Sequence, residues 1–335
     1  MKYKFLGKSG MRISELVMGA MTFGNECDKK SSFILLDKFE SAGGNTIDTA
    51  NVYSNGSSES IVGEWLKSKD RDNFVVATKV RFPIGERPNE AGVSTKHIRN
   101  SVKKSLERLQ TDYIDLYQIH AWDSNTPLEE SLYTLSCLVD DGLVNYIGVS
   151  NFKGWQLQKA LDISEKYGFR RIISVQPQYN LLERGVEYEI KDVIQDNGLG
   201  VISWSPLRGG WLTGKFQQNT RPVDTNTRVG RSNAIDPGEA WERYNNTKTW
   251  EVIKTEEEIA NRRGVTVSQV SINWVRSQKW ITSPIIGARN LEQLEPNLAC
   301  LDWELSESEI KELNEVSKME NFYPYDFIEW AVKRR

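Results

Sequence analysis

Short apolar runs alternate with longer amphipathic segments along almost the whole chain. Eight runs are expected to form strands, because several are short, apolar and flanked by turn residues, as parallel strands buried on both faces are. These runs are Leu16–Met18, Thr46–Ile47, Phe74–Ala77, Ile114–Gln118, Tyr146–Val149, Ile172–Val175, Gly200–Trp204 and Ser283–Ile286. A helical pattern can follow each run, so the chain is expected to repeat a strand–helix unit.

Periodic stripes and capping signals support the helices of these units. From about Thr95 to Arg108 the apolar residues recur three or four positions apart, which predicts a helix with one buried face. Thr126 before Pro127 predicts a helix start with a capping hydroxyl and a proline at the first helical position. Ser306 with Glu309 forms a capping box that predicts another helix start.

Three segments fall outside the alternation. Residues 1–13 are expected to form a β-hairpin around the turn at residues 7–10. Residues 208–243, after the seventh strand, form a long polar loop, and loops of that length in a compact domain are usually functional. The tail at residues 321–325 is expected to pack on the rest of the protein, with closure over a pocket as the alternative.

The pattern predicts one α/β domain spanning residues 1–335. Eight strand–helix units favour a (β/α)8 (TIM) barrel with an N-terminal β-hairpin, a long loop after strand 7 and a C-terminal tail. The alternative is an open doubly wound sheet, which is expected to show a Gly-x-Gly-x-x-Gly turn after an early strand. The sequence has no such turn.

Composition and charge exclude several classes of protein. The 335 residues include 43 basic and 46 acidic side chains, and the net charge of −3 argues against nucleic-acid binding and against a polybasic membrane surface. The three cysteines and two histidines lack the spacing of a structural zinc site, and an odd number of cysteines indicates free thiols. No secretory signal or membrane-spanning stretch is visible, so a cytoplasmic location is expected.

Polar residues end three consecutive expected strands. Asp48 ends the second, Lys79 the third and His120 the fourth, and Tyr53 lies in the loop after the second strand. Strand ends meet on one face of a barrel, so the four side chains are expected to share a pocket. The other histidine, His97, is expected on a helix surface among lysines, in a structural role.

These four residues suit proton donation to a developing alkoxide. A tyrosine is a poor acid at neutral pH, but a nearby ammonium favours its phenolate form. The Asp48 carboxylate would hold Lys79, and His120 would donate to the oxygen of a bound carbonyl compound. Such a site requires a hydride donor on the opposite side of the carbonyl group.

At these residues the sequence resembles the aldo-keto reductases, and the resemblance covers almost the whole chain. The segment 43–50, followed by Tyr53, is similar to the first signature of the family. Tyr53, Asp48, Lys79 and His120 match the catalytic tetrad of the family residue by residue. The resemblance implies NADP(H) as the cofactor, bound on a barrel and not by a Rossmann turn.

The resemblance also implies cofactor-binding positions. Ser150, Asn151 and Gln176 match the residues that hold the nicotinamide carboxamide, and Trp204 matches the residue that stacks on the ring. The remaining cofactor positions are Thr22, Asp48, Ser205, Pro206, Leu207, Gly209, Leu212, Gly214, Lys215, Ile286, Gly287, Arg289, Gln293 and Asn297. Those from 207 to 215 resemble a loop over the pyrophosphate, and those from 286 to 297 resemble a pocket for adenosine and its 2′-phosphate.

The residues themselves support a phosphate near Arg289. A guanidinium near the end of the eighth strand can hold a phosphate in a fork, and the helix that follows offers its N-terminus. NADP(H) is therefore expected to be preferred over NAD(H).

The expected function is reversible, NADPH-dependent reduction of aldehydes and ketones to alcohols. Tyr53 is the expected general acid, Lys79 and Asp48 are expected to lower its pKa, and His120 to orient the carbonyl group. The substrate pocket is expected to include Phe23, Tyr53, His120 and Trp122. An aromatic wall favours apolar carbonyl substrates.

Tryptophans are numerous, with 11 in the chain. Four are expected near the mouth of the pocket and four others in or near the core. The mouth set is Trp122, Trp204, Trp211 and Trp241, and the core set is Trp65, Trp155, Trp274 and Trp303.

Two alternative functions remain open at this point. One is a binding or regulatory subunit that keeps the barrel and the cofactor, as the potassium-channel β subunits that resemble this family do. The other is an unrelated barrel hydrolase that uses Asp48 with a second carboxylate, which leaves Lys79, Tyr53 and Arg289 without a role. The expected partner is a small-molecule carbonyl substrate, and the sequence leaves the oligomeric state open.

Overall fold

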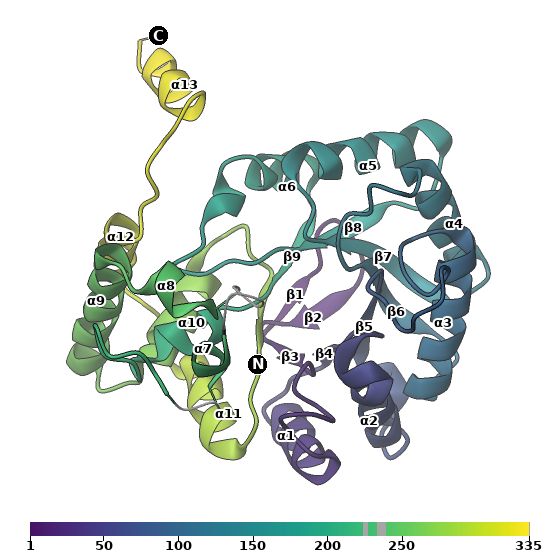
Figure 1. Cartoon of the computed structure of the whole chain (residues 1–335), viewed down its shortest axis with the longest axis horizontal. Coiled ribbons are helices and arrows are strands. Elements are labelled where there is room, and N and C mark those ends of the chain that lie inside the picture. Colours follow the sequence, from purple (N-terminus) through teal and green to yellow (C-terminus); the bar gives the residue numbers. More distant parts are fainter. Residues whose placement is uncertain (224–226, 233–238, 335) are drawn as a thin grey trace.

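A closed barrel of parallel strands forms the centre of the protein (Figure 1). The computed structural model describes residues 1–223, 227–232 and 239–334. Within them the barrel strands are β3 (Val17–Gly19), β4 (Thr46–Asp48), β5 (Val75–Val80), β6 (Ile114–Ile119), β7 (Val144–Ser150), β8 (Ile172–Gln176), β9 (Gly200–Ser203) and β10 (Ser283–Ile286). The strands follow one another around the barrel in chain order, and β10 closes it by pairing with β3. The predicted (β/α)8 barrel is confirmed.

Helices surround the barrel and follow its strands along the chain (Figure 1). They are α1 (Lys29–Ser41), α2 (Ser57–Leu66), α3 (Thr95–Leu109), α4 (Leu128–Asp140), α5 (Gly154–Tyr167), α6 (Ile190–Asn197), α9 (Thr247–Arg263), α10 (Val267–Ser277), α11 (Leu291–Leu298) and α12 (Glu307–Val316). In α3 the apolar stripe is buried, as its periodicity predicts, with Ile98, Val102 and Leu109 fully covered. No helix in the described part of the chain is both long and apolar enough to cross a membrane.

The two predicted caps have different outcomes. Ser306 caps α12, because its hydroxyl accepts from the backbone N–H of Glu309 while the Glu309 carboxylate accepts from the N–H of Ser306. The prediction for Thr126 is wrong, since α4 begins at Leu128 with Pro127 at the cap position. The Thr126 hydroxyl donates instead to the Asp123 carboxylate at 2.8 Å, which takes it away from the helix end.

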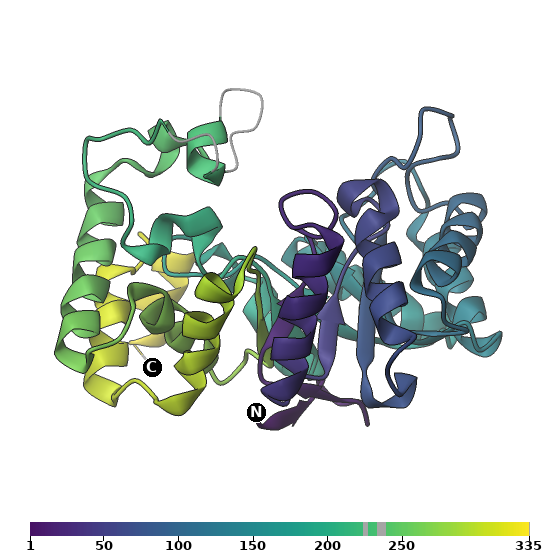
Figure 2. The same ribbon diagram turned by 90° about the horizontal axis from the view of Figure 1, so that it is seen from below.

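The N-terminal hairpin closes one end of the barrel. Strands β1 (Tyr3–Phe5) and β2 (Arg12–Ser14) pair antiparallel, as predicted, and Figure 2 shows them (purple) at the lower end. Leu6, Met11 and Ile13 belong to a buried cluster that includes inward side chains of several barrel strands. The hairpin therefore covers the N-terminal ends of the strands and leaves the opposite end for a site.

His97 is a buried residue, so its expected place on a helix surface is wrong. Its side chain is 1% exposed, and its ring nitrogens lie 3.0 Å from the Asn89 carbonyl oxygen and 3.3 Å from the Ser101 hydroxyl. Burial lowers the pKa of His97. The lysines of α3 lie on the exposed face, and His97 has the structural role that the sequence suggested, on the other side of the helix.

The long segment after β9 folds back on an aromatic cluster. It contains the 3₁₀ helix η4 (Arg208–Thr213) and the short helices α7 (Arg228–Arg231) and α8 (Trp241–Tyr244). Trp211 stacks on Trp241 with ring centres 5.1 Å apart, and Trp250 packs beside both rings. Residues 224–226 and 233–238 of the expected loop 208–243 lie outside the described residues.

Three of the tryptophan predictions are corrected by the structure. Trp211 is fully buried and Trp241 is 7% exposed, so neither lies open at a pocket mouth, because they pack on each other. Trp155, expected in the core, is 55% exposed on α5, where it packs only edge-on against Trp122. Trp65 and Trp274 are buried, as predicted.

The C-terminal tail projects from the barrel. It ends in α13 (Tyr325–Val332), which Figure 1 shows apart from the other helices, and none of the described residues from 321 to 334 is buried. Its contacts with the barrel domain include ring contacts of Phe322 and Tyr325 with Tyr188 and a hydrogen bond from the Tyr325 hydroxyl to Glu189. The tail was expected to pack on the rest of the protein, but among the described residues its start packs on Tyr188 and Glu189 while α13 projects away.

Candidate active site

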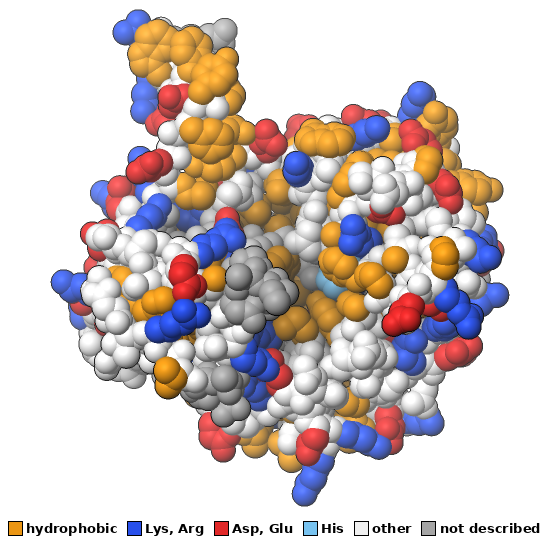
Figure 3. Space-filling model, in the orientation of Figure 1, with side chains coloured by type: hydrophobic (Ala, Val, Ile, Leu, Met, Phe, Trp, Pro, Cys, Tyr) orange, Lys and Arg blue, Asp and Glu red, His pale blue; other side chains and the backbone are white. Residues whose placement is uncertain are grey.

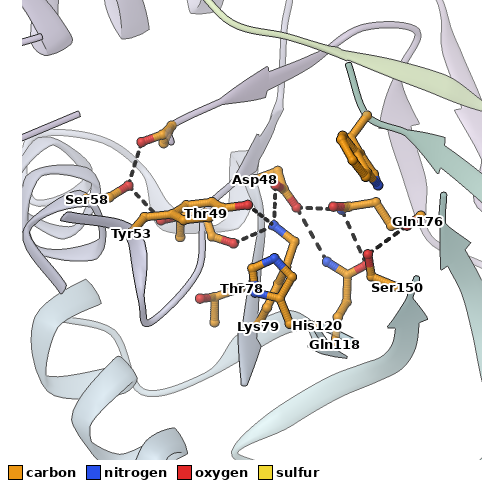
Figure 4. Close-up of polar contacts among 12 residues, drawn as sticks. Asp48, Thr49, Tyr53, Ser58, Thr78, Lys79, Gln118, His120, Ser150 and Gln176 are labelled. Atoms are coloured by element: carbon orange, nitrogen blue, oxygen red, sulfur yellow. Dashed lines mark hydrogen bonds and ion pairs between the residues drawn. The ribbon is translucent and has the colours of Figure 1, made fainter. Parts of the chain in front are cut away.

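The predicted tetrad meets at the C-terminal end of the barrel, opposite the hairpin. Asp48 is the last residue of β4, and Lys79 lies one residue before the end of the neighbouring strand β5. The Lys79 ammonium lies 2.5 Å from the Asp48 carboxylate and donates to the backbone carbonyl of Thr49 at 2.8 Å (Figure 4). Both side chains are buried, with Lys79 completely covered.

Tyr53 completes the surroundings of the ammonium. It begins η1 (Tyr53–Gly56), a tight turn in which Ser54 and Asn55 adopt left-handed backbone angles. The turn brings the phenol back over the strand ends, where its hydroxyl accepts a hydrogen bond from Lys79 at 3.4 Å. Lys79 thus has a separate acceptor for each of its three N–H donors.

The charges of this group set its proton affinities. Burial lowers the pKa of Lys79, but Asp48 and Tyr53 more than offset this, so its pKa is raised and the amine stays charged. Burial raises the pKa of Tyr53, while Lys79 lowers it and Asp48 raises it, and the net shift is upward. The expectation that Lys79 and Asp48 together lower this pKa is therefore wrong for Asp48, whose carboxylate repels a phenolate. The phenol is a neutral acid at neutral pH.

His120 directly follows β6 and lies beside the phenol. Its ring meets Tyr53 edge-on with centres 5.7 Å apart, and Phe82 on its other side at 4.7 Å. Burial, and then the charges of Lys79 and Arg81, lower the pKa of His120 to about 2. The imidazole is neutral, and its Nδ1 atom is buried with no hydrogen-bond partner among the described residues.

The next strand ends join the same network. Gln176, at the end of β8, donates to Asp48 Oδ1 at 2.7 Å, and its backbone carbonyl accepts from the Ser150 hydroxyl at the end of β7. The Asn151 amide donates to the carbonyl of His120, and its side-chain oxygen accepts from the Trp204 indole at 3.2 Å. The structure therefore brings these four expected cofactor residues together beside the tetrad.

Sequence reasoning missed two residues of this site. Gln118 is fully buried, lies opposite Lys79 in the β5–β6 register, and donates to Asp48 Oδ1 at 3.4 Å. Its signal is an amide in an apolar strand one residue from the end. Phe82 follows β5 and covers His120, but a single aromatic residue in a loop gives no comparable signal.

A cluster of arginines lies near the end of β10. The Arg289 guanidinium lies 2.8 Å from the Glu26 carboxylate, which also pairs with Arg231 at 2.5 Å and Arg228 at 4.0 Å. Burial raises the pKa of Glu26, but the three guanidiniums outweigh it and the pKa is lowered. Three guanidiniums thus gather at one carboxylate, and guanidinium groups can hold a phosphate through paired hydrogen bonds.

The remaining expected cofactor residues border the same face or support it. Thr22 donates to the Ala288 carbonyl, the Arg289 N–H donates to the Gln293 side chain, and Gly287 faces open space. Leu207 accepts backbone hydrogen bonds from Gly210 and Leu212, which shapes η4. Ser205 has a left-handed φ of 59°, Asn297 is 5% exposed and Leu212 is fully buried. Pro206, Gly209, Gly214, Lys215 and Ile286 lie in or beside these two segments.

An apolar hollow opens above the tetrad. Figure 3 shows hydrophobic surface around it and histidine surface at its base, and His120 is 9% exposed. Trp122, two residues after His120, is partly buried and packs on Phe152. Phe23 is fully buried in the core, so the expectation that it lines the pocket is not met. No group of three or more potential metal ligands occurs among the described residues.

Comparison with known proteins agrees with this geometry. The sequence profile described as "Aldo/keto reductase family" matches residues 15–318. An uncharacterized oxidoreductase of Bacillus subtilis, YrpG, is 36% identical over 94% of this chain and 96% of its own length. Norsolorinic acid reductase B of Dothistroma septosporum is 34% identical over 98% of this chain and 84% of its own length.

A relative with a different kind of name matches as well. A protein of Oryza sativa subsp. japonica named a probable voltage-gated potassium channel subunit beta is 36% identical over 90% of this chain and 92% of its own length. This chain is thus similar both to relatives named as oxidoreductases or reductases and to a relative named as a channel subunit. The family match and the length of these alignments lead to one conclusion: the chain belongs to the aldo/keto reductase family.

Proposed function

We propose that the protein catalyses reversible, NADP(H)-dependent reduction of aldehydes and ketones to alcohols. The observation that supports this most directly is the Tyr53 hydroxyl, held by the buried Lys79–Asp48 pair beside the neutral ring of His120. This group offers a proton to an oxygen atom in the hollow. It contains a single carboxylate, Asp48, which is occupied by Lys79, so the hydrolase alternative gains no support.

The residues near the tetrad fit NADP(H). The arginines at Glu26 offer guanidinium donors for a 2′-phosphate, and Gly287 faces open space near Arg289. Ser150, Asn151 and Gln176 would hold the carboxamide, Trp204 would stack on the nicotinamide ring, and the η4 segment would cover the pyrophosphate. When bound, this cofactor supplies the hydride.

The residues of this chain would transfer the proton and orient the substrate. Tyr53 donates its hydroxyl proton to the carbonyl oxygen as negative charge develops there. Lys79 then stabilises the phenolate, and Asp48 keeps the ammonium charged and in place. The neutral imidazole of His120 has one N–H that can hydrogen-bond to the carbonyl oxygen without releasing a proton. In alcohol oxidation the same phenolate takes the proton back.

The surroundings favour an apolar substrate. Phe82 packs against the ring of His120, Trp122 follows His120 by two residues, and the visible wall of the hollow is largely hydrophobic. Such a wall offers few partners for the hydroxyl groups of a sugar. We therefore expect aromatic and aliphatic aldehydes to be better substrates than aldoses.

The proposal predicts a cytoplasmic enzyme. Its three cysteines, Cys27, Cys137 and Cys300, are free thiols, which agrees with a reducing compartment.

The Tyr53→Phe variant tests the proposed function. It keeps the ring but removes the proton, so turnover of NADPH with a panel of aldehydes is expected to fall by at least about a hundredfold. NADPH binding, followed by quenching of tryptophan fluorescence, is expected to stay within about threefold of wild type. A variant that retains wild-type turnover would contradict the role of Tyr53.

The relative named as a channel subunit supports one alternative, a cofactor-binding subunit with little catalysis. The same experiment separates the two functions. NADPH binding without turnover of any aldehyde by the wild-type protein would favour the subunit over the enzyme.

A further inference from the structure

A buried carboxyl group lies behind the segment that would cover the cofactor. Glu256, on α9, is 0% exposed, and its Oε1 atom is hydrogen-bonded to the Ser271 hydroxyl on α10. Its Oε2 atom has no hydrogen-bond partner among the described residues. Such a group needs a specific reason to be tolerated, because burying an unpaired carboxylate is costly.

Ser271 connects this carboxyl group to η4. Its Oγ atom lies 3.1 Å from the carbonyl oxygen of Leu212, and the Val267 carbonyl of its own helix is farther away at 3.4 Å. Leu212 is fully buried and sits between Gly209 and Gly214, both with left-handed backbone angles. The hydrogen bond from Ser271 therefore holds the Leu212 carbonyl in place within a segment of irregular backbone.

The hydrogen bond between Ser271 and the Leu212 carbonyl depends on whether Glu256 is protonated. A serine hydroxyl has a single proton, so it can donate to Leu212 or to Glu256 but not to both. If Glu256 is protonated, its O–H donates to Ser271 Oγ, and the Ser271 O–H remains for Leu212. If Glu256 is ionised, its proton passes to solvent, the carboxylate takes the serine proton, and the Leu212 carbonyl loses its donor.

We propose that protonated Glu256 is a positioning residue for η4, acting through Ser271 on the Leu212 carbonyl, and that loss of its proton releases this segment. The part of the inference that concerns cofactor affinity rests on the proposed function, in which η4 covers the pyrophosphate.

Burial and the neighbouring groups place the transition of Glu256 near pH 8. Burial raises the pKa of Glu256 to about 8, the hydrogen bond from Ser271 opposes this, and repulsion from Glu257 adds to it. On the packed helix α12, Glu309 and Glu312 pair with Arg263 and Arg262 at the C-terminal end of α9. Within η4, Arg208 pairs with Glu239, and the Lys215 ammonium lies beside Gly210.

The direction of the pH effect follows from this pKa. An acid is protonated below its pKa, so the link to Leu212 is complete at pH 7 and is lost as the pH rises through about 8. A cofactor that requires an ordered η4 then binds more weakly at high pH.

Four proteins test the proposal: wild type, Glu256→Gln, Ser271→Ala and Glu258→Gln. Glutamine keeps an N–H donor toward Ser271 and has no titrating group. Alanine removes the hydroxyl that reaches Leu212. Glu258, on the same helix with a side chain 52% exposed, is the matched control for loss of one carboxylate.

The first measurement is hydrogen exchange of residues 208–216 in the protein without cofactor, at pH 7 and 9.5, corrected for the intrinsic rate. In wild type and Glu258→Gln the corrected rate is expected to rise about fivefold. Glu256→Gln is expected to keep the slow rate at both pH values, and Ser271→Ala to exchange quickly at both. A Glu256→Gln protein that follows the wild-type pH change, or a Ser271→Ala protein with slow exchange, would overturn the proposal.

The second measurement separates this inference from the proposed function. The dissociation constant of NADPH is expected to rise about fivefold between pH 7 and 9.5 in wild type and to stay constant in Glu256→Gln. Absence of NADPH binding at pH 7 in every protein would refute the proposed function, while the exchange data would still decide the role of Glu256. Parallel pH curves for the two proteins would refute the coupling to the cofactor.

Discussion

At the scale of single residues, the site depends on how each buried charge is neutralised. Asp48 accepts from Lys79, Gln118 and Gln176, so the carboxylate is surrounded by donors from three other strands. Lys79 lies on the adjacent strand β5, whereas Gln176 lies on β8, on the opposite side of the closed barrel. The hydrogen bond from Gln176 to Asp48 therefore forms only in the closed barrel.

Removal of one partner of the buried pair should destabilise the protein strongly. Lys79→Met leaves Asp48 buried without its cation, which is expected to lower the free energy of unfolding by about 3–5 kcal/mol. Urea denaturation measures this difference. The double variant Asp48→Asn with Lys79→Met removes both charges and should recover much of the loss, and a double variant as unstable as the single one would contradict the explanation.

Arg289 should set the choice between the two cofactors. Arg289→Ala removes a charged donor from the arginine cluster, so the affinity for NADPH is expected to fall about ten- to a hundredfold, with little change for NADH. Titration of both cofactors by tryptophan fluorescence gives the ratio. Lys30→Ala, which removes a cation in the first turn of α1, is the control and should keep the wild-type ratio. An unchanged ratio in Arg289→Ala would count against a 2′-phosphate at this position.

At the scale of elements, aromatic packing holds the segment after β9 in place. One cluster of ring contacts, formed by Trp211, Trp241, Trp250 and Phe216, connects η4, α8 and α9. Arg208 adds a hydrogen bond to the Tyr244 hydroxyl at 2.8 Å and an ion pair with Glu239. This irregular segment is held in place by four buried side chains, those of Arg208, Trp211, Leu212 and Phe216.

Truncation of the central ring should loosen this segment. Trp211→Ala is expected to lower the free energy of unfolding by about 3–5 kcal/mol, because the ring is fully buried and leaves a cavity. Trp155→Ala is the matched control, since its ring is 55% exposed, and its effect should stay within about 1 kcal/mol. Chemical denaturation of both variants provides the comparison, and equal effects would contradict the packing role of Trp211.

Local sequence signals predict elements well where the stabilising contacts are local. The Ser306 capping box forms because both partners lie within one turn of α12. The Thr126 cap fails because Asp123 takes the hydroxyl in the loop before α4. His97 is similar, because its side chain is buried and its ring contacts the Asn89 carbonyl outside α3, which its lysine neighbours in the sequence do not reveal.

At the scale of the whole molecule, the barrel domain and the tail are distinct in their packing. The family profile ends at residue 318, and the described residues after Glu320 bury no side chain. Among the described residues, the tail contacts the barrel domain through the rings of Phe322 and Tyr325 on Tyr188 and through the Tyr325 hydroxyl on Glu189. We therefore expect the tail to add little to the stability of the barrel domain.

Removal of residues 321–335 should leave the barrel intact. The truncated protein keeps the hydrogen bond from Tyr188 to the Glu320 carbonyl, and its free energy of unfolding is expected to change by less than about 1 kcal/mol. Turnover of NADPH with an aldehyde should stay within about twofold of the full chain. A large loss of either quantity in thermal unfolding and kinetic assays would show that the tail packs on the barrel in solution.

The tetrad could be predicted from the sequence because its residues end successive strands of a recognisable pattern. Asp48, Lys79 and His120 lie at or within one residue of the strand end in three consecutive strand–helix units, and the closed barrel brings these strand ends together. Gln118 could not be predicted in the same way, because its contact with Asp48 becomes apparent only when the register of its strand against Lys79 is known. Phe23 was misplaced because its sequence position says nothing about which way the ring turns.

The sequence by itself determined the strand–helix alternation, the barrel and the hairpin, and it pointed to the four residues that we propose as the tetrad, since these depend on periodicity and on residue type at strand ends. Tertiary structure alone decided the upward shift in the pKa of Tyr53, the neutral state of His120, the pairing of Glu26 with Arg289 and the burial of Trp211 and Glu256. The physical reason is that burial and charge pairing depend on distances between segments far apart in the chain, which a one-dimensional pattern does not contain.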